Sequence, residues 1–191
     1  DGAGIAHYGL SRNGLIADNK ILFNETFNQT PNTGGSGGGI LVAGHEPLVA
    51  AAVQLSAGSG SVKILRNLIQ GNHAGAGDGG GIALRFVNGQ DVIASADPAQ
   101  WFAVDVLNNV VVNNESGIRF WDGHFPGQSA LRNVLIAHNT VVNNRTTAIK
   151  WDAGPHAGTV VRNNVFAAES GSGLLMLQAN SLEGIALDHN L

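Results

Sequence analysis

Apolar and polar residues recur along the chain in one register, which becomes visible when the chain is aligned with itself. In most copies an asparagine has apolar residues three and five positions before it and another two positions after it. A second asparagine follows five positions later in the first four copies, whereas the fifth copy has Glu169 there. The first asparagine of each copy stands at Asn19, Asn67, Asn109, Asn139, Asn164 and Asn190. So many aligned columns indicate an internal repeat.

The repeat unit is short and is built from strands. The units between Asn109 and Asn190 are the shortest, and the earlier ones carry insertions. Within a unit, apolar residues alternate with period two, and the alternation breaks at the asparagine, which indicates short strands joined by corners. A unit of this length cannot bury its apolar face alone. Stacked copies can, with each strand pairing in parallel with its counterpart in the next coil.

Two sequence motifs carry a resemblance to a known family. The run V-x-[IV]-x-x-N-x-[IV]-x-x-N occurs at 62–72, 104–114 and 134–144, and GGGI occurs at 37–40 and 79–82. Together with the repeat, which covers essentially the whole chain, they resemble the right-handed parallel β-helix family. This pectin-lyase-like superfamily includes pectate lyases, polygalacturonases, tailspikes and many bacterial surface proteins. The resemblance implies an all-β fold, a single-stranded right-handed parallel β-helix (solenoid) of about six coils, with an asparagine ladder and lateral loop insertions.

The asparagines have a physical reason to stand at corners. Asparagine tolerates a left-handed backbone better than other residues that carry a side chain, so we expect the ladder asparagines to adopt it. Their amides would bond to the backbone of the coils above and below. Glycines at 37–39 and 79–81 would supply a positive φ at another corner. The position just before each ladder asparagine is polar, which predicts that it faces solvent; it holds Asp18, Arg66, Asn108, His138, Asn163 and His189.

Composition and charge narrow the classes of function. The chain of 191 residues has 27 glycines, 13% charged residues, 43% hydrophobic residues and a net charge of −4. This charge gives no reason to expect nucleic acid as a partner, and no apolar run approaches the ~20 residues of a membrane-spanning helix. The absence of cysteine excludes thiol chemistry and fits an exported bacterial protein. Because the sequence starts within its repeat pattern and without Met, we expect residues 1–191 to be one domain, a segment of a larger secreted or cell-surface protein.

The insertions, and with them the candidate site residues, are expected on one side of the stack of coils. Four of them follow the same apolar column and would therefore stack into a lateral wall: 44–61, 88–103, 122–131 and 153–158. Beside this wall, RFWDGH (119–124) and KWDAGPH (150–156) repeat one theme of a base, a tryptophan, an aspartate and a histidine. The theme predicts that Arg119 and Lys150 point outward on neighbouring coils.

One interpretation of this wall is a sugar site. Tryptophan rings would stack on sugar rings, and the basic side chains would bind uronate carboxylates. The substrate-binding candidates are Trp101, Trp121, Trp151, His124 and His156. In an enzyme the catalytic candidates would be Arg119, Asp122, Lys150 and Asp152. The aspartates would also suit Ca²⁺ in a lyase-like site, whereas no other cofactor and no metal site is expected.

The other interpretation is structural, with tryptophans that fill corners between coils and aspartates that cap turns. The Asn-Thr-Asp, Asp-Asp, Gly-His-Gly and Arg-Ile-Lys motifs of polygalacturonases do not occur in the sequence, which favours this interpretation. The leading hypothesis is therefore a non-catalytic structural or glycan-binding module whose partner would be a polysaccharide or a cell-surface glycan. A polysaccharide lyase or glycoside hydrolase acting on an acidic polymer is the alternative. A self-assembling or partner-binding rod is the third hypothesis.

Apolar residues also stand at positions that alternation turns outward. The third position after the ladder asparagine holds Leu22, Gln70, Val112, Val142 and Ala167. Rows this continuous indicate a covered face. We expect either the chain's own loops to cover it, or a neighbouring domain or a second copy to pack there.

Overall fold

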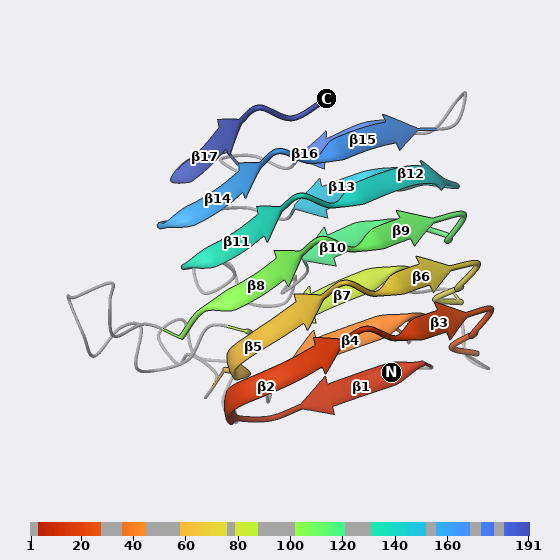
Figure 1. Ribbon diagram of the computed structural model, residues 1–191, viewed down its shortest axis with the longest axis horizontal. Helices are drawn as coiled ribbons and strands as arrows, with labels where there is room; N and C mark the ends of the chain where they lie inside the picture. The colour runs from red at the N-terminus through yellow and green to blue at the C-terminus, as the bar shows by residue number, and fades with distance from the viewer. Residues whose placement is uncertain are drawn as a thin grey trace.

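The computed structural model describes residues 4–27, 36–44, 58–75, 79–87, 102–120, 131–151, 156–168, 173–177 and 182–191. Within these ranges every regular element is a β-strand, and the strands form three sheets, here called A, B and C. Successive strands along the chain go to sheets A, B and C in turn, so that each coil adds one layer to the stack (Figure 1). This is the parallel β-helix that the repeat predicts. None of the described residues forms a helix that could cross a membrane.

All strand pairs within the three sheets are parallel. Sheet A consists of β1 (Ile5–Tyr8), β4 (Ile40–Ala43), β7 (Ile82–Arg85), β10 (Ile118–Phe120), β13 (Thr147–Trp151) and β16 (Gly173–Leu177). Sheet B consists of β2 (Ser11–Ala17), β5 (Gly60–Leu65), β8 (Val104–Leu107), β11 (Val134–Ala137), β14 (Thr159–Arg162) and β17 (Ile185–Asp188). Sheet C consists of β3 (Lys20–Leu22), β6 (Leu68–Gln70), β9 (Val110–Val112), β12 (Thr140–Asn144) and β15 (Val165–Ala168).

Alternation within the strands fills the core. In β5, Val62 and Ile64 point inward and are fully buried, whereas Lys63 between them is exposed. Ile64 pairs in register with Val106 of the next coil, so apolar side chains of neighbouring coils stack on one another in the core. Sheet C contributes one inward residue per coil, such as Val111, and sheet A closes the third side of the core. The hydrophobic positions of the repeat therefore specify the interior of the stack.

The ladder asparagines bond from coil to coil as predicted. At each step the backbone N–H and the side-chain Nδ2 of one asparagine donate to Oδ1 of the asparagine in the following coil, at 2.9–3.1 Å. Nδ2 of an inner asparagine also donates to a carbonyl of the preceding coil, as from Asn109 to Ile64. A second ladder bonds in the same way at the next corner, through Asn24, Asn72, Asn114 and Asn144. The inner asparagines are almost fully buried, so the ladders satisfy polar groups within the stack.

The left-handed backbone lies one residue earlier than predicted. The ladder asparagines have no positive φ, and the turn is made by the exposed residues just before them: Asp18 (59°), Arg66 (53°), Asn108 (54°), His138 (58°), Asn163 (54°) and His189 (46°). The prediction of a left-handed asparagine is wrong, because the preceding residue turns the chain and the asparagine then aims its amide along the stack. The prediction that this preceding column faces solvent is confirmed.

The glycine runs serve two different needs. Only the first glycine of each run has a positive φ, 71° at Gly37 and 79° at Gly79. The third glycine allows two coils to approach closely, because a methyl group at Gly39 or Gly81 would lie 2.5 Å from the carbonyl oxygen of Gly81 or Gly117, respectively. Turn geometry therefore explains one glycine, and backbone contact between coils explains the other.

Candidate functional site

The outer face of sheet A carries the basic residues of the predicted site. Arg119 of β10 pairs in register with Lys150 of β13 on one side and with Ala83 of β7 on the other. Ile118 and Phe120, which flank Arg119, belong to the core, so Arg119 lies on the outer side of the strand. The prediction that Arg119 and Lys150 stand side by side on neighbouring coils is confirmed. Arg85, two residues beyond Ala83, adds a third basic side chain to the same face.

From β4 to β13 this outer face is largely covered. Arg119 is only 5% exposed, and Lys150 and Arg85 are partly buried. Toward the N-terminal coils, Leu41, Ala43 and Ala83 form a buried apolar cluster separate from the core. Side chains on the outer side of a sheet become this inaccessible only where other atoms of the chain pack over them. The described face is therefore packed from β4 to β13, whereas at its N-terminal edge Tyr8 of β1 is 56% exposed.

Two of the predicted substrate-binding residues are part of the interior. Trp151 is 1% exposed and belongs to the core, because alternation in β13 turns it inward beside the outward Lys150. His156 is fully buried, accepts a hydrogen bond at Nδ1 from the backbone N–H of Leu131 at 2.9 Å, and packs edge-on against the ring of Phe120. Neither side chain is placed to contact a sugar, so the prediction that they bind substrate is corrected to a packing role.

The remaining candidates lie outside the described residues. These are Trp101, Trp121, Asp122, His124 and Asp152, and their roles stay predictions. Among the residues that the structure does describe, no group of three or more histidine, aspartate and glutamate side chains could hold a metal ion. The structure thus places Arg119 and Lys150 together and leaves the acidic partners of the hypothetical enzyme undescribed.

A column of acidic side chains, a histidine and an arginine at the corner between sheets C and A was missed by the sequence analysis. His73 lies between two glutamates, with Nδ1 3.6 Å from Oε1 of Glu25 and Nε2 3.6 Å from Oε1 of Glu115. Arg145 follows in the next coil, with Nη2 3.3 Å from the same Glu115 oxygen. Each of these residues stands one position after an asparagine of the second ladder, which is the signal that could have revealed the column. The column links four coils through contacts of the two glutamates with His73 and Arg145.

A pair of oppositely charged residues joins two coils at the corner between sheets B and C. Arg66 donates to Asp18 through Nε at 2.7 Å and through Nη2 at 2.6 Å. The hydrogen bonds from Arg66 lower the pKa of Asp18, and the same bonds raise the pKa of Arg66. Both side chains are more than half exposed, so the pair fixes local geometry more than it adds stability.

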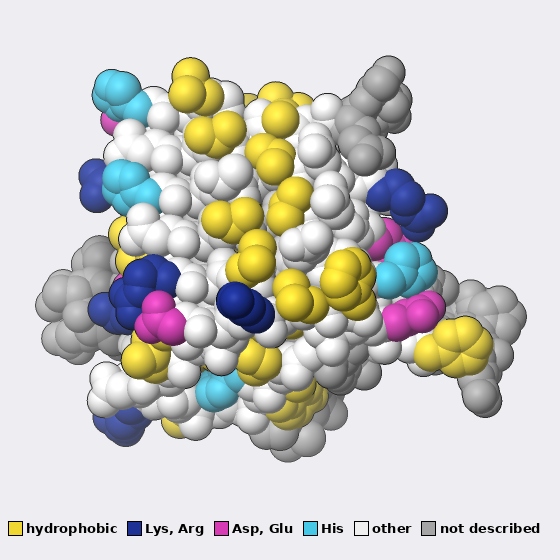
Figure 2. Space-filling model, turned by 45° about the vertical axis from the view of Figure 1, so that its right-hand side comes forward, with side chains coloured by type: hydrophobic (Ala, Val, Ile, Leu, Met, Phe, Trp, Pro, Cys, Tyr) yellow, Lys and Arg dark blue, Asp and Glu magenta, His cyan; other side chains and the backbone are white. Residues whose placement is uncertain are grey.

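The outer face of sheet C is an apolar surface that the chain leaves open. Leu22, Val110 and Val165 are 39–40% exposed, and Val112 and Val142 between them are partly exposed. Figure 2 shows hydrophobic side chains in a band that runs across the coils. Of the two expectations for this face, complete covering by the chain's own loops is therefore wrong. What the band contacts outside the chain stays a prediction.

The resemblance to the pectin-lyase-like superfamily rests on the sequence motifs and the repeat, and it stays a prediction. Comparison with known proteins found no matching family model, no similar curated protein and no similar solved structure.

Proposed function

We propose that this chain is a non-catalytic structural module, a β-helical segment of a secreted or cell-surface protein. The observation that carries the proposal is the burial of three of the four described site candidates: Arg119, Trp151 and His156 are between 0 and 5% exposed, and the fourth, Lys150, is partly buried. A catalytic or ring-stacking side chain must reach its substrate, whereas these three contribute to packing. The described polar residues at the corners, the two asparagine ladders above all, hold coils together.

Secretion or surface display is supported by composition. The chain contains no cysteine, and its stability in this proposal comes from stacked apolar columns and ladders instead of disulfides. Glycan binding by such a module would need residues other than Trp151 and His156, since both are interior.

An activity test separates this proposal from the enzyme alternative. The purified chain is incubated with a panel of uronate polymers, while absorbance is followed for unsaturated products and a reducing-end assay is run for hydrolysis. We expect no turnover of any polymer. Turnover that is lost in Lys150→Ala, in a variant whose circular dichroism matches the parent, would overturn the proposal and favour a lyase or hydrolase. A Lys63→Ala variant is the matched control, because Lys63 is an exposed lysine on the outer side of sheet B.

A further inference from the structure

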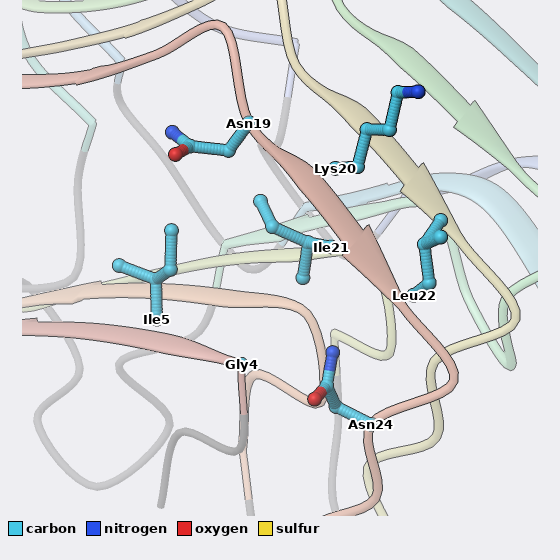
Figure 3. Close-up of a pocket in the computed structure, with 7 residues that line it drawn as sticks. All are labelled: Gly4, Ile5, Asn19, Lys20, Ile21, Leu22 and Asn24. Carbon is cyan, nitrogen blue, oxygen red and sulfur yellow. The ribbon is translucent and has the colours of Figure 1, made fainter.

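The outer face of sheet C carries two rows of side chains that cross its five strands. The first row runs from Lys20 to Val165 and the second from Leu22 to Ala167, and strand pairing keeps each row in register. Figure 3 shows the start of both rows on β3, where Lys20 and Leu22 point away from the core while Ile21 points into it. Figure 2 shows hydrophobic side chains running across the coils on this face. Because parallel sheets ordinarily have both faces covered, this face points to a partner.

The side chains of both rows become shorter from β3 to β15. The first row begins with Lys20 and Leu68, and its last three strands contribute only valine and threonine. The second row begins with Leu22 and Gln70, continues with two valines and ends with Ala167. The outer face of sheet C is therefore raised at β3 and lowered at β15.

A face with this slope fits a second copy of itself. When the second copy is turned about a two-fold axis that runs parallel to the strands above β9, β3 of one copy lies over β15 of the other. Leu22 then faces Ala167, and Val112 faces its own counterpart, so long side chains meet short ones across the whole contact. Two copies stacked in the same direction would bring β3 over β3 and leave a gap over β15. A second copy also carries the same spacing between coils, which an unrelated partner would have to reproduce.

The face has the size of a weak contact between proteins. With strands about 4.8 Å apart and about 3.3 Å per residue, the five strands between their two corners cover roughly 400 Å². This is about half of the ~800 Å² that each partner contributes to an interface of standard size. The apolar rows supply the driving force for binding, because contact removes them from water. A second copy is therefore expected to bind reversibly, with a dissociation constant of roughly 10–100 μM.

We propose that two copies of this chain associate through the outer faces of their sheets C, with the two stacks of coils antiparallel and the two-fold axis over β9. The same surface of each copy takes part, so the contact is isologous and closes at a dimer. The strands of the facing sheets lie within about 30° of each other, as in other aligned sheet packing. The contact uses the outer face alone and none of the strand edges at either end of the stack. This inference goes beyond the structural role and does not depend on the chain being non-catalytic.

Sedimentation velocity of the purified chain, from well below to well above this dissociation constant, tests the association. We expect a reversible equilibrium between monomer and dimer. Val112→Lys should raise the dissociation constant about tenfold or more, because it buries an ammonium group at the centre of the contact. Val160→Lys is the matched control and should leave it unchanged, since Val160 is a partly exposed, outward valine on an inner strand of sheet B. Both variants should match the circular dichroism of the parent. A monomer at all concentrations would overturn the proposal, as would association that Val112→Lys leaves intact.

Crosslinking through single cysteines tests the antiparallel arrangement. The chain has no cysteine, so an introduced thiol reports on one position. A short bismaleimide should join a Leu22→Cys copy to an isotopically labelled Ala167→Cys copy, and mass spectrometry identifies the mixed pair. Leu22→Cys alone should crosslink much less, because its two thiols would lie about 19 Å apart along the stack. Adding Val112→Lys to both copies should remove the mixed crosslink. Equal yields for the mixed pair and for Leu22→Cys alone would overturn the proposed arrangement, and so would a mixed crosslink that persists in the presence of Val112→Lys.

Discussion

Replacing Asn109 with alanine tests whether the ladder holds the coils together. Oδ1 of Asn109 accepts from the backbone N–H of Asn67 at 2.9 Å and from its Nδ2 at 3.0 Å. Nδ2 of Asn109 donates to the carbonyl of Ile64 at 2.9 Å and to Oδ1 of Asn139 at 3.0 Å. Asn109→Ala removes all four hydrogen bonds and leaves their partners in the stack.

The expected loss of stability follows from what stays buried. Asn67 is 2% exposed, so its N–H cannot exchange the lost acceptor for bulk water. A buried polar group without a partner costs about 1–3 kcal/mol, and three further groups each lose one bond. We therefore expect the free energy of unfolding to fall by about 2–4 kcal/mol, a large share of the ~5–15 kcal/mol of an ordinary domain.

Equilibrium unfolding in urea, followed by far-UV circular dichroism, measures this loss. Asn19→Ala is the matched control, because the same substitution at the end of the ladder removes a side chain that is partly exposed and whose Oδ1 accepts nothing from the described residues. We expect it to cost about 1 kcal/mol. Equal losses in the two variants, at equal dependence on urea, would refute the argument that the ladder acts through buried hydrogen bonds.

Three further predictions address the charged corner, the core and the coil contact. Arg66→Asn, which keeps a residue that tolerates the left-handed turn, should raise the pKa of Asp18 toward its ordinary value, as measured by an NMR titration of the carboxyl. Since the folded pKa of Asp18 is lowered, the contribution of the pair is present above the ordinary carboxyl pKa and is lost as pH falls through the lowered value, so parent and variant should converge in acid. Trp151→Ala should lower the free energy of unfolding by about 3–5 kcal/mol, and a near-neutral result in urea unfolding would contradict its place in the core. Gly81→Ala should cost about 1–3 kcal/mol, whereas Gly173→Ala, whose methyl group would meet its nearest atom at 3.6 Å, should be tolerated; similar melting temperatures for both would argue against the close coil contact.

The fold could be predicted because its cause is periodic. Each apolar column stands at a fixed offset from its ladder asparagine, and the structure pairs the strands in that register, as with Ile64 and Val106. The position of the left-handed residue could not be predicted in the same way. Asn108 and Asn109 are the same residue type, and only the bonds between coils distinguish the one that turns the chain from the one that forms the ladder.

The candidate site was predicted less well because burial there depends on contacts that do not repeat. Alternation correctly placed Lys150 outward, and the same rule applied one residue further would have turned Trp151 inward. His156 lies within the insertion at 153–158, where no period exists, and its contacts with Leu131 and Phe120 join segments far apart in the sequence. Residue type alone suggested that Trp151 and His156 contact a sugar, but both side chains are packed inside the protein.

The asparagine ladder gives the stack of coils a direction. A hydrophobic column is symmetric, because apolar surface does not distinguish one end of the stack from the other. An asparagine ladder is not symmetric. Each inner asparagine donates from its backbone N–H to the following coil and accepts at Oδ1 from the preceding coil. Asn19 and Asn190 are therefore unlike ends of one series, although their side chains are identical. The residues that fix the fold thus also give the stack a direction, and neighbouring coils match both in their apolar columns and in the direction of the ladder bonds.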